Sequence, residues 1–155
     1  MIIANKEMKH KDIKGENMTE ILVASHGHFA SGLKNSIEIL TGMGDKIQTI
    51  DAYVDQSDYT KQIIRFIENA QHPAVIFTDL KGGSVNQKVV LEAVNKKNIF
   101  VVTQTNLAIV MAVLLDNEKL TRDHIQDLIN QSQVELCQID DSQTESNDSD
   151  GDFFE

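Results

Sequence analysis

A histidine at the end of an apolar run is the first feature of this sequence that could do chemistry. The stretch ILVASHGHFASGL, residues 21–33, leads from apolar residues directly into His26 and, after Gly27, into His28. An imidazole with a pKa of about 6.5 is mostly neutral near pH 7, so one ring nitrogen keeps a free lone pair. His26 is therefore a candidate nucleophile, although a hydrogen-bonded polar residue at a strand end would have the same sequence pattern.

The stretch TDLKGGSVNQ, residues 78–87, contains a second set of candidate groups. Gly82 and Gly83 have unhindered backbone amides. Ser84 is predicted to cap the next helix, with Gln87 completing a capping box. The amides and the positive dipole end of that helix would attract an anion. The stretch lacks the Lys-Ser/Thr ending of a P-loop, and a plain turn with a helix cap would explain it equally well.

Alternating strand and helix patterns indicate how these groups are positioned. The expected strands are residues 20–25, 46–54, 74–80 and 99–104, with a last one at 134–139; the expected helices are 29–42, 57–71, 84–97, 106–116 and 121–133. Strands that alternate with helices through short connections form a parallel sheet with helices on both faces, so an open α/β fold is predicted. Gly42 is the expected stop of the first helix, and Ser57 and Asn106 are expected N-caps of two others.

The carboxyl ends of the predicted strands bring the candidate groups together. His26 ends the first strand and Asp79 the third, and these strands are neighbours in the sheet order 2-1-3-4. A carboxylate that accepts a hydrogen bond from one imidazole nitrogen fixes the tautomer and aims the other nitrogen at an electrophile. The nearby helix amides would stabilise the oxygens of an arriving phosphoryl group. These residues therefore predict phosphoryl transfer, provided that Asp79 raises the pKa of the imidazole only modestly.

Composition restricts the class of protein. The chain has 155 residues, enough for one domain, and one cysteine, Cys137, which fits a reducing compartment such as the cytoplasm. No apolar run approaches the roughly 20 residues that span a bilayer. Residues 140–155 hold seven acidic and no basic side chains, whereas the rest of the chain has a net charge of only −3. This balance, without a basic cluster, argues against nucleic-acid binding, which depends on neutralising phosphates.

Three segments are expected along the chain. Residues 1–18 show neither a clear period nor a signal-peptide pattern, so we interpret them as an extension. Residues 19–139 hold the predicted α/β domain. Residues 140–155 have the composition of a disordered acidic tail, in which Phe153 and Phe154 could anchor a partner.

Together, the stretches ILVASHGHFASGL and VIFTDLKGGSVNQ resemble the IIA component of the mannose family of the bacterial phosphoenolpyruvate-dependent sugar phosphotransferase system. The resemblance implies that His26 accepts a phosphoryl group from the histidine of the carrier protein HPr and passes it to a IIB component. It also implies that Asp79 orients His26. Ser84 would contact the phosphoryl group, together with Gly82 and Gly83.

The resemblance covers about residues 20–139 and also implies an assembly. Members of this family form homodimers in which the C-terminal strand, here residues 134–139, crosses to the partner's sheet as an antiparallel edge strand. The expected setting is the cytoplasm, in association with the membrane IIC and IID components of the permease complex. The family implies no cofactor and no metal.

The chain departs from the family pattern at the rim of the predicted crevice. His28 and Lys81 stand where many members have aromatic residues, and Val85 stands where many have proline. Gly27, His28 and Lys81 would line the rim rather than take part in the transfer. These differences bear on the choice of partner and sugar more than on the chemistry.

Three other interpretations are open. A module with the same fold could act as a phosphorylation-sensitive regulator or scaffold. A small-molecule hydrolase could use His26 as a base and Asp79 as its orienting group, although no serine or cysteine nucleophile is evident. A zinc site could use His26, His28 and Asp79, but an H-x-H pair with one distant carboxylate is a sparse ligand set.

Overall fold

The structure, a computed structural model, describes residues 18–139. Nearly all of the predicted N-terminal extension and the whole acidic tail lie outside the described residues. The elements are, in chain order, β1 (Glu20–His26), α1 (Phe29–Thr41), the 3₁₀ turn η1 (Gly44–Lys46), β2 (Ile47–Ala52), α2 (Tyr59–Asn69), β3 (Ala74–Thr78), α3 (Ser84–Ala93), β4 (Ile99–Val102), α4 (Leu107–Leu114) and α5 (Arg122–Gln131).

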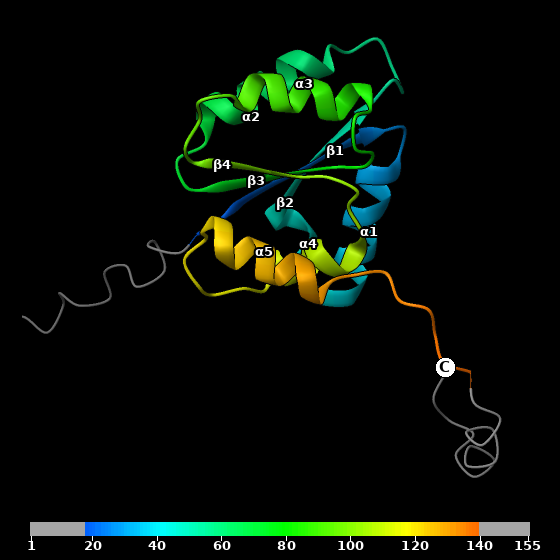
Figure 1. The fold of residues 1–155 in the computed structure, drawn as a ribbon. Coiled ribbons are helices and arrows are strands. Elements are labelled where there is room, and N and C mark those ends of the chain that lie inside the picture. Colours follow the sequence, from blue (N-terminus) through cyan, green and yellow to red (C-terminus); the bar gives the residue numbers. More distant parts are fainter. Residues whose placement is uncertain (1–17, 140–155) are drawn as a thin grey trace, which may run out of the picture.

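Four parallel strands form one sheet in the order β2-β1-β3-β4, which confirms the predicted order. Helices α1, α4 and α5 cover one face of the sheet, and α2 and α3 cover the other (Figure 1). The molecule therefore has three layers. Because β1 and β3 are neighbours in the middle of the sheet, the residues that follow them meet at its carboxyl edge.

Side chains alternate along β1 between two apolar cores. Ile21 and Val23 pack into the core under α1, α4 and α5, whereas Leu22 and Ala24 pack into the core under α2 and α3. All of β3 is buried, and its Phe77 is fully buried. A parallel strand covered by helices on both faces is apolar at every position. This burial explains why the central strands are continuous apolar runs in the sequence.

The helix ends confirm two of the predicted capping or stop residues, and a third prediction is wrong by one residue. The first helix stops at Gly42, whose φ of +68° is left-handed, and Asn106 caps α4 by accepting a backbone N–H at 2.9 Å. The N-cap of α2 is Asp58, one residue after the predicted Ser57, and its carboxylate accepts the backbone N–H of Lys61 at 3.2 Å.

Several predicted elements are shorter in the structure. α3 ends at Ala93 instead of residue 97, and Asn95 just beyond it has a φ of +63°. β4 ends at Val102, before Gln104 with a φ of +56°. Val94, directly after α3, has a ψ of 132°, which already leaves the helical region, and neither left-handed residue can continue a right-handed helix or a strand.

The predicted C-terminal strand is not present in the single chain. Residues 134–139 form no strand and lead away from the three layers (Figure 1). Val134, Leu136 and Ile139 are each more than 90% exposed. A strand needs a neighbouring strand as its hydrogen-bond partner, and within the described chain this segment has none.

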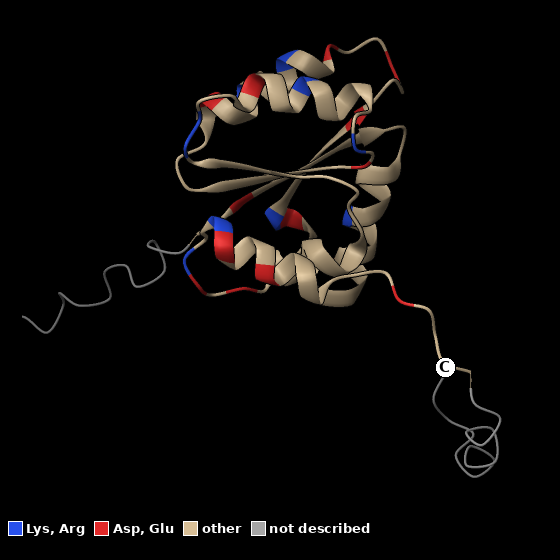
Figure 2. Ribbon diagram, in the orientation of Figure 1, with Lys and Arg blue, Asp and Glu red and all other residues tan. Residues whose placement is uncertain are grey.

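Charged residues are spread over the loops and helices of both outer layers. Figure 2 shows Lys and Arg interspersed with Asp and Glu rather than gathered on one face. Among the described residues, none of the helices has the length and apolar character needed to cross a membrane.

A histidine in the first turn of α5 pairs with acidic side chains of the connection from α4, and its charge stabilises the fold. His124 Nε2 lies 2.7 Å from Asp116 Oδ2, and its Nδ1 lies 3.7 Å from a Glu118 carboxylate oxygen. The hydrogen bond with Asp116 raises the pKa of His124 above 6.5, and this effect outweighs the opposing effect of burial. A raised pKa means that the folded protein holds the proton more tightly than the unfolded chain.

We therefore expect the free energy of unfolding to decrease as the pH rises through the folded-state pKa of His124. The contribution is fully present below about pH 6.5, the pKa of an unfolded-chain histidine. Urea unfolding of the wild-type chain at pH 6 and pH 9, beside His124→Gln, measures it. His72→Gln, in the loop between α2 and β3, is the matched control. An equal pH dependence in the wild type and His124→Gln would contradict this assignment.

Candidate functional site

His26 and Asp79 meet at the carboxyl edge of the sheet, as predicted. His26 is the last residue of β1, and Asp79 follows the last residue of β3. Asp79 Oδ2 accepts the backbone N–H of His26 at 2.9 Å and also lies 2.9 Å from Nδ1 of the same ring. One carboxylate oxygen therefore holds both the backbone and the ring of His26, which fixes the direction of the imidazole.

The charge of Asp79 determines the tautomer of His26. Burial alone would raise the pKa of Asp79, but hydrogen bonds from the backbone and ring of His26 outweigh it and lower the pKa below 3.8. Asp79 is thus ionised at neutral pH and can only accept hydrogen bonds. In the neutral imidazole of His26, Nδ1 must then carry the proton, and Nε2 keeps the free lone pair.

The free nitrogen of His26 faces the start of α3. Nε2 lies 3.1 Å from Ser84 Oγ, so the serine hydroxyl donates to this nitrogen. Ser84 is the first residue of α3, and Gly83 precedes it as the N-cap, which corrects the prediction that Ser84 itself caps the helix. Gln87 Nε2 donates to the Gly82 carbonyl at 2.7 Å, so this pair does not form the predicted capping box.

The amides of Gly82 and Gly83 are not free to bind a ligand, because both donate hydrogen bonds within the loop. The Gly82 N–H donates to Asn86 Oδ1 at 3.0 Å, and the Gly83 N–H donates to the Leu80 carbonyl at 3.1 Å. By helix geometry, the N–H groups that lack intrahelical partners belong to the first residues of α3, beginning with Ser84. A Cβ on Gly83 would lie 3.2 Å from His26 Cε1, so this position lets the loop approach the ring.

A buried amide holds the loop in this shape. Asn86 is nearly fully buried, and its Nδ2 donates to Thr78 Oγ1 at 3.0 Å while its Oδ1 accepts the Gly82 N–H. The side chain ties the first turn of α3 to the end of β3. It thereby fixes the loop that contains Asp79, a role that the sequence pattern did not reveal.

His28 forms a separate pair at the rim. Its Nδ1 lies 3.0 Å from Asp51 Oδ2, and Asp51 Oδ1 accepts the backbone N–H of Ser31. The His28 side chain is 79% exposed, against 40% for His26. Burial would raise the pKa of Asp51, but its hydrogen bonds with Ser31 and His28 lower it overall.

The other two predicted rim residues flank the site. Gly27 has a φ of +56°, and its N–H donates to the Ala52 carbonyl at 2.9 Å, which ties the residue after His26 to the end of β2. Lys81 is exposed in the loop before α3.

A metal does not fit this arrangement. Within residues 18–139, no group of three or more His, Cys, Asp or Glu side chains could hold a metal ion. The two histidines near the site are each taken up by a different aspartate, so they do not converge on one point.

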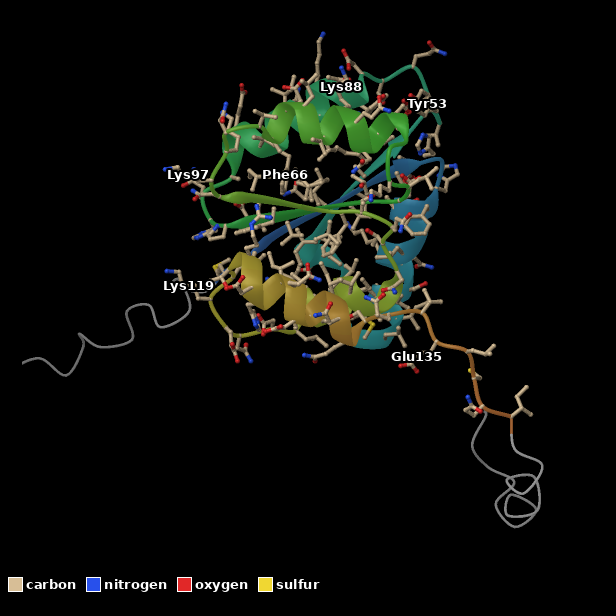
Figure 3. The ribbon with its side chains drawn as sticks, viewed as in Figure 1. Tyr53, Phe66, Lys88, Lys97, Lys119 and Glu135 are labelled. Carbon is tan, nitrogen blue, oxygen red and sulfur yellow. The ribbon has the colours of Figure 1, made fainter. Side chains whose placement is uncertain are left out.

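Two tyrosines, Tyr53 and Tyr59, complete the site, although no sequence pattern indicated them as site residues. The ring of Tyr53 stacks on the His26 imidazole, with centroids 5.6 Å apart and planes 18° apart. Its hydroxyl lies 2.8 Å from Ser84 Oγ and 3.1 Å from the Tyr59 hydroxyl. Tyr53 lies in the loop after β2, at the same edge of the sheet (Figure 3). Tyr53 directly follows β2, a strand that neighbours β1, and this position in the sequence could have indicated that it lies near His26.

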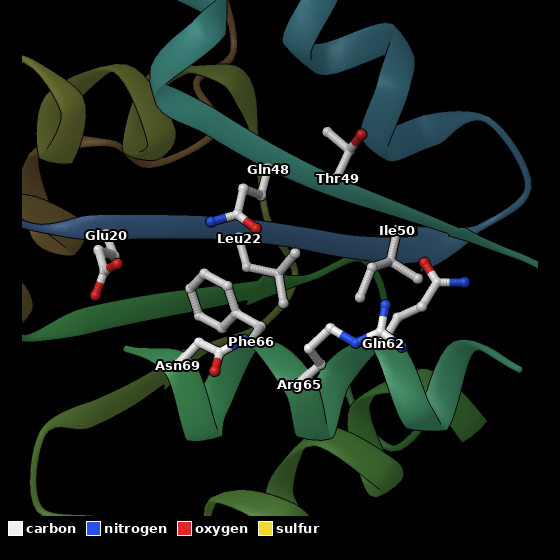
Figure 4. Close-up of a pocket in the computed structure, with 9 residues that line it drawn as sticks. All are labelled: Glu20, Leu22, Gln48, Thr49, Ile50, Gln62, Arg65, Phe66 and Asn69. Carbon is white, nitrogen blue, oxygen red and sulfur yellow. The ribbon is translucent and has the colours of Figure 1, made fainter. Parts of the chain in front are cut away.

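A polar groove lies apart from this site. It has a volume of about 240 Å³, runs along the free edge of β2 beside α2 (Figure 4), and is lined by Glu20, Leu22, Gln48, Thr49, Ile50, Gln62, Arg65, Phe66 and Asn69. None of these residues contacts His26 or its hydrogen-bond partners in the network described above.

The parallel sheet and the aspartate-bound histidine at its carboxyl edge define the class of a IIA component of the sugar phosphotransferase system. The family model described as "PTS system fructose IIA component" matches residues 20–130. The chain belongs to this family, which is the mannose-type EIIA family, and is a component of a sugar phosphotransferase system.

Solved structures agree with this assignment. A Klebsiella pneumoniae protein described as a phosphoenolpyruvate-dependent sugar phosphotransferase system permease is 28% identical over 76% of this chain and 85% of its own, with a TM-score of 0.63. A phosphotransferase system EIIA component from Streptococcus agalactiae is 24% identical over 74% and 92%, with a TM-score of 0.62. A mannose/sorbose-specific IIA subunit from Enterococcus faecalis is 20% identical over 79% and 100%, with a TM-score of 0.57. The last two matches show the fold alone. The comparison with curated proteins gives no match.

Proposed function

We propose that this protein carries a phosphoryl group on Nε2 of His26, received from the phosphohistidine of HPr and passed to a IIB component. The observation that supports this best is the arrangement around one ring: Asp79 holds Nδ1, and Ser84 meets Nε2. The side chain is 40% exposed at the edge of the sheet, so a docking protein can reach it. The setting that we propose is cytoplasmic, beside the permease components.

The transfer needs no cofactor. The donor N–P bond breaks as the bond between phosphorus and His26 Nε2 forms, and the donor nitrogen keeps the electron pair. The ring of phosphorylated His26 becomes more positive, and the Asp79 carboxylate stabilises it through the Nδ1 proton. The Ser84 hydroxyl and the first amides of α3 then face the phosphoryl oxygens, where a helix N-terminus favours negative charge. Positioning and charge stabilisation are what a loose transition state requires.

Labelling tests this proposal directly. The protein is incubated with labelled phosphoenolpyruvate, Enzyme I and HPr, and the label is mapped by digestion and by the acid lability and alkali stability typical of phosphohistidine. We expect the label on His26 and its loss when a IIB component is added. Label elsewhere, or none, would refute the proposal. Stable label on His26 that no IIB component removes would instead identify a regulatory module.

Two glycine variants test separately the backbone conformation of the loop and its close approach to His26. Gly83→Ala places a methyl group about 3.2 Å from the ring and from the Leu80 carbonyl. The ring and the carbonyl must then move apart by a few tenths of an ångström. Because a displacement of about 1 Å can slow a reaction about 10²-fold, we expect this smaller one to slow phosphorylation severalfold. Gly82→Ala has open space but a φ of +74°, so we expect it to lower the free energy of unfolding by about 1 kcal/mol.

Stopped-flow or rapid-quench phosphorylation measures the first effect, and urea unfolding measures the second. Equal phosphorylation rates in Gly83→Ala and the wild type would contradict the close approach of this loop to His26.

We also propose a homodimer that uses the open edge of β4. A groove of about 360 Å³ runs along this strand between α3 and α5. Its apolar lining includes Val90, Val94, Phe100, Ile125 and Ile129. The exposed, alternating segment 134–139 has the composition of a strand that could pair with β4 of a second copy.

Charge substitutions on this segment test the dimer. Val134 and Leu136 would lie on one face of the added strand, and Glu135 on the other. Burying a leucine contributes about 1.5–3 kcal/mol, and each dimer would bury two, so Leu136→Asp should weaken dimerisation by roughly 10²- to 10⁴-fold. Glu135→Gln is the matched control. Sedimentation velocity that shows a wild-type monomer at tens of micromolar would refute the dimer.

A further inference from the structure

Tyr53 has an unusual backbone and a specific position over the reacting ring. Its φ is +69°, a left-handed conformation that residues with a side chain rarely adopt, and Tyr53 is 63% exposed. For an aromatic residue this conformation is strained, and strained residues cluster at functional sites. Here the conformation places the tyrosine ring against one face of His26, with the two planes 18° apart.

The hydrogen bonds that join these residues have one direction. Since Nε2 of His26 must accept, the Ser84 hydroxyl uses its only proton on that nitrogen. Ser84 Oγ can then only accept from the Tyr53 hydroxyl, 2.8 Å away. The Tyr53 oxygen in turn accepts from the Tyr59 hydroxyl at 3.1 Å. The chain of donors therefore runs from Tyr59 through Tyr53 and Ser84 to His26.

The pKa direction of Tyr59 agrees with its place at the outer end of this order. The hydrogen bond to Tyr53 raises the pKa of Tyr59, as expected for the outermost donor of the chain.

We propose that Tyr53 is a positioning residue for phosphoryl transfer, which aims the Ser84 hydroxyl at Nε2 of His26 and covers one face of the ring. This inference rests on the proposed function of His26. Once phosphorus is bonded to Nε2, that nitrogen no longer accepts, and the Ser84 proton turns to a phosphoryl oxygen. Tyr53 still donates to Ser84 Oγ after the transfer. The serine hydroxyl therefore donates to Nε2 before the transfer and to a phosphoryl oxygen after it.

A tyrosine suits a carrier that must also release its group. Its hydroxyl is neutral, so it orders Ser84 without adding the charge of a lysine or arginine, which would bind the phosphoryl group strongly. Its ring shields the stacked face of the imidazole from water. We therefore expect Tyr53 to increase the rate of transfer and to lengthen the lifetime of phosphorylated His26.

Three variants separate these roles. Tyr53→Phe keeps the ring and removes the hydroxyl, Tyr53→Asn removes the ring while tolerating the left-handed backbone, and Tyr59→Phe removes the outer donor. For each we measure the rate of phosphorylation by phospho-HPr, the rate of hydrolysis of phosphorylated His26 and the ¹⁵N chemical shift of Nε2 in the unphosphorylated protein. Urea unfolding shows whether each variant keeps its fold.

We expect Tyr53→Phe to slow phosphorylation about five- to tenfold, with a shift of the Nε2 resonance and no faster hydrolysis. Tyr53→Asn should slow it similarly and speed hydrolysis severalfold. Tyr59→Phe should slow phosphorylation about twofold. If the wild type is labelled on His26 and Tyr53→Phe has the same phosphorylation rate and the same Nε2 chemical shift, the role of Tyr53 is wrong. The proposed function of His26 is not affected by that result. A wild type that takes no label overturns both.

Discussion

Replacing His26 with glutamine is expected to abolish phosphorylation by phospho-HPr, lowering its rate by roughly 10³-fold or more, as loss of a nucleophile does. Glutamine has an amide that can still donate to Asp79, but it has no ring nitrogen with a nucleophilic lone pair. The variant should fold, because the side chain lies at the exposed edge of the sheet and outside both apolar cores. Rapid-quench labelling measures the rate.

The matched control is His28→Gln, two residues away. His28 is also held by an aspartate, through Nδ1 and Asp51 Oδ2, but the Ser84 hydroxyl at the start of α3 meets His26 and not His28. We expect this variant to take label within about twofold of the wild-type rate, since it leaves the hydrogen bonds of His26 intact. Label retained in His26→Gln and lost in His28→Gln would assign the nucleophile to His28 instead.

The second large effect is expected for Asp79→Asn, which should slow phosphorylation by roughly 10²- to 10⁴-fold, as neutralising the orienting aspartate does in catalytic triads. An asparagine amide can donate to Nδ1 and so favour the tautomer whose proton sits on Nε2. It also lacks the charge that stabilises the ring once phosphorus is bound. Both losses act on the same step, and rapid-quench labelling measures its rate.

Asp51→Asn is the control for a general effect of removing a carboxylate at this edge. Asp51 holds His28 and the start of α1, and it has no contact with His26 among its hydrogen bonds. We expect its phosphorylation rate to stay within about threefold of the wild type. If Asp79→Asn were phosphorylated as fast as Asp51→Asn, the orienting role of Asp79 would be wrong.

The pH dependence of the orienting pair has a defined sign. Because the pKa of Asp79 is lowered in the folded protein, its contribution to stability is fully present above the ordinary carboxyl pKa of 3.8 and is lost as the pH falls through the folded value. Orientation of His26 by an ionised Asp79 is therefore retained throughout the neutral range in which a carrier would work.

Local patterns along the chain were enough to predict the sheet and the two residues that meet at its carboxyl edge. Runs such as ILVA and AVIF are apolar at every position because both faces of β1 and β3 are covered, and this local property is visible without coordinates. The sheet order then required His26 and Asp79 to share an edge, and the structure places them in contact. Patterns of this kind are carried by neighbouring residues in the chain.

The other groups that reach the ring of His26 could not be predicted from local patterns. The φ of Tyr53 and its stacking on His26, the burial of Asn86 behind the loop, and the use of both glycine amides inside that loop depend on contacts between distant segments. Segment 134–139 is a second example in which local sequence did not decide the structure. Its alternation predicts a strand, but a strand also needs an edge to pair with, and the single described chain does not supply one.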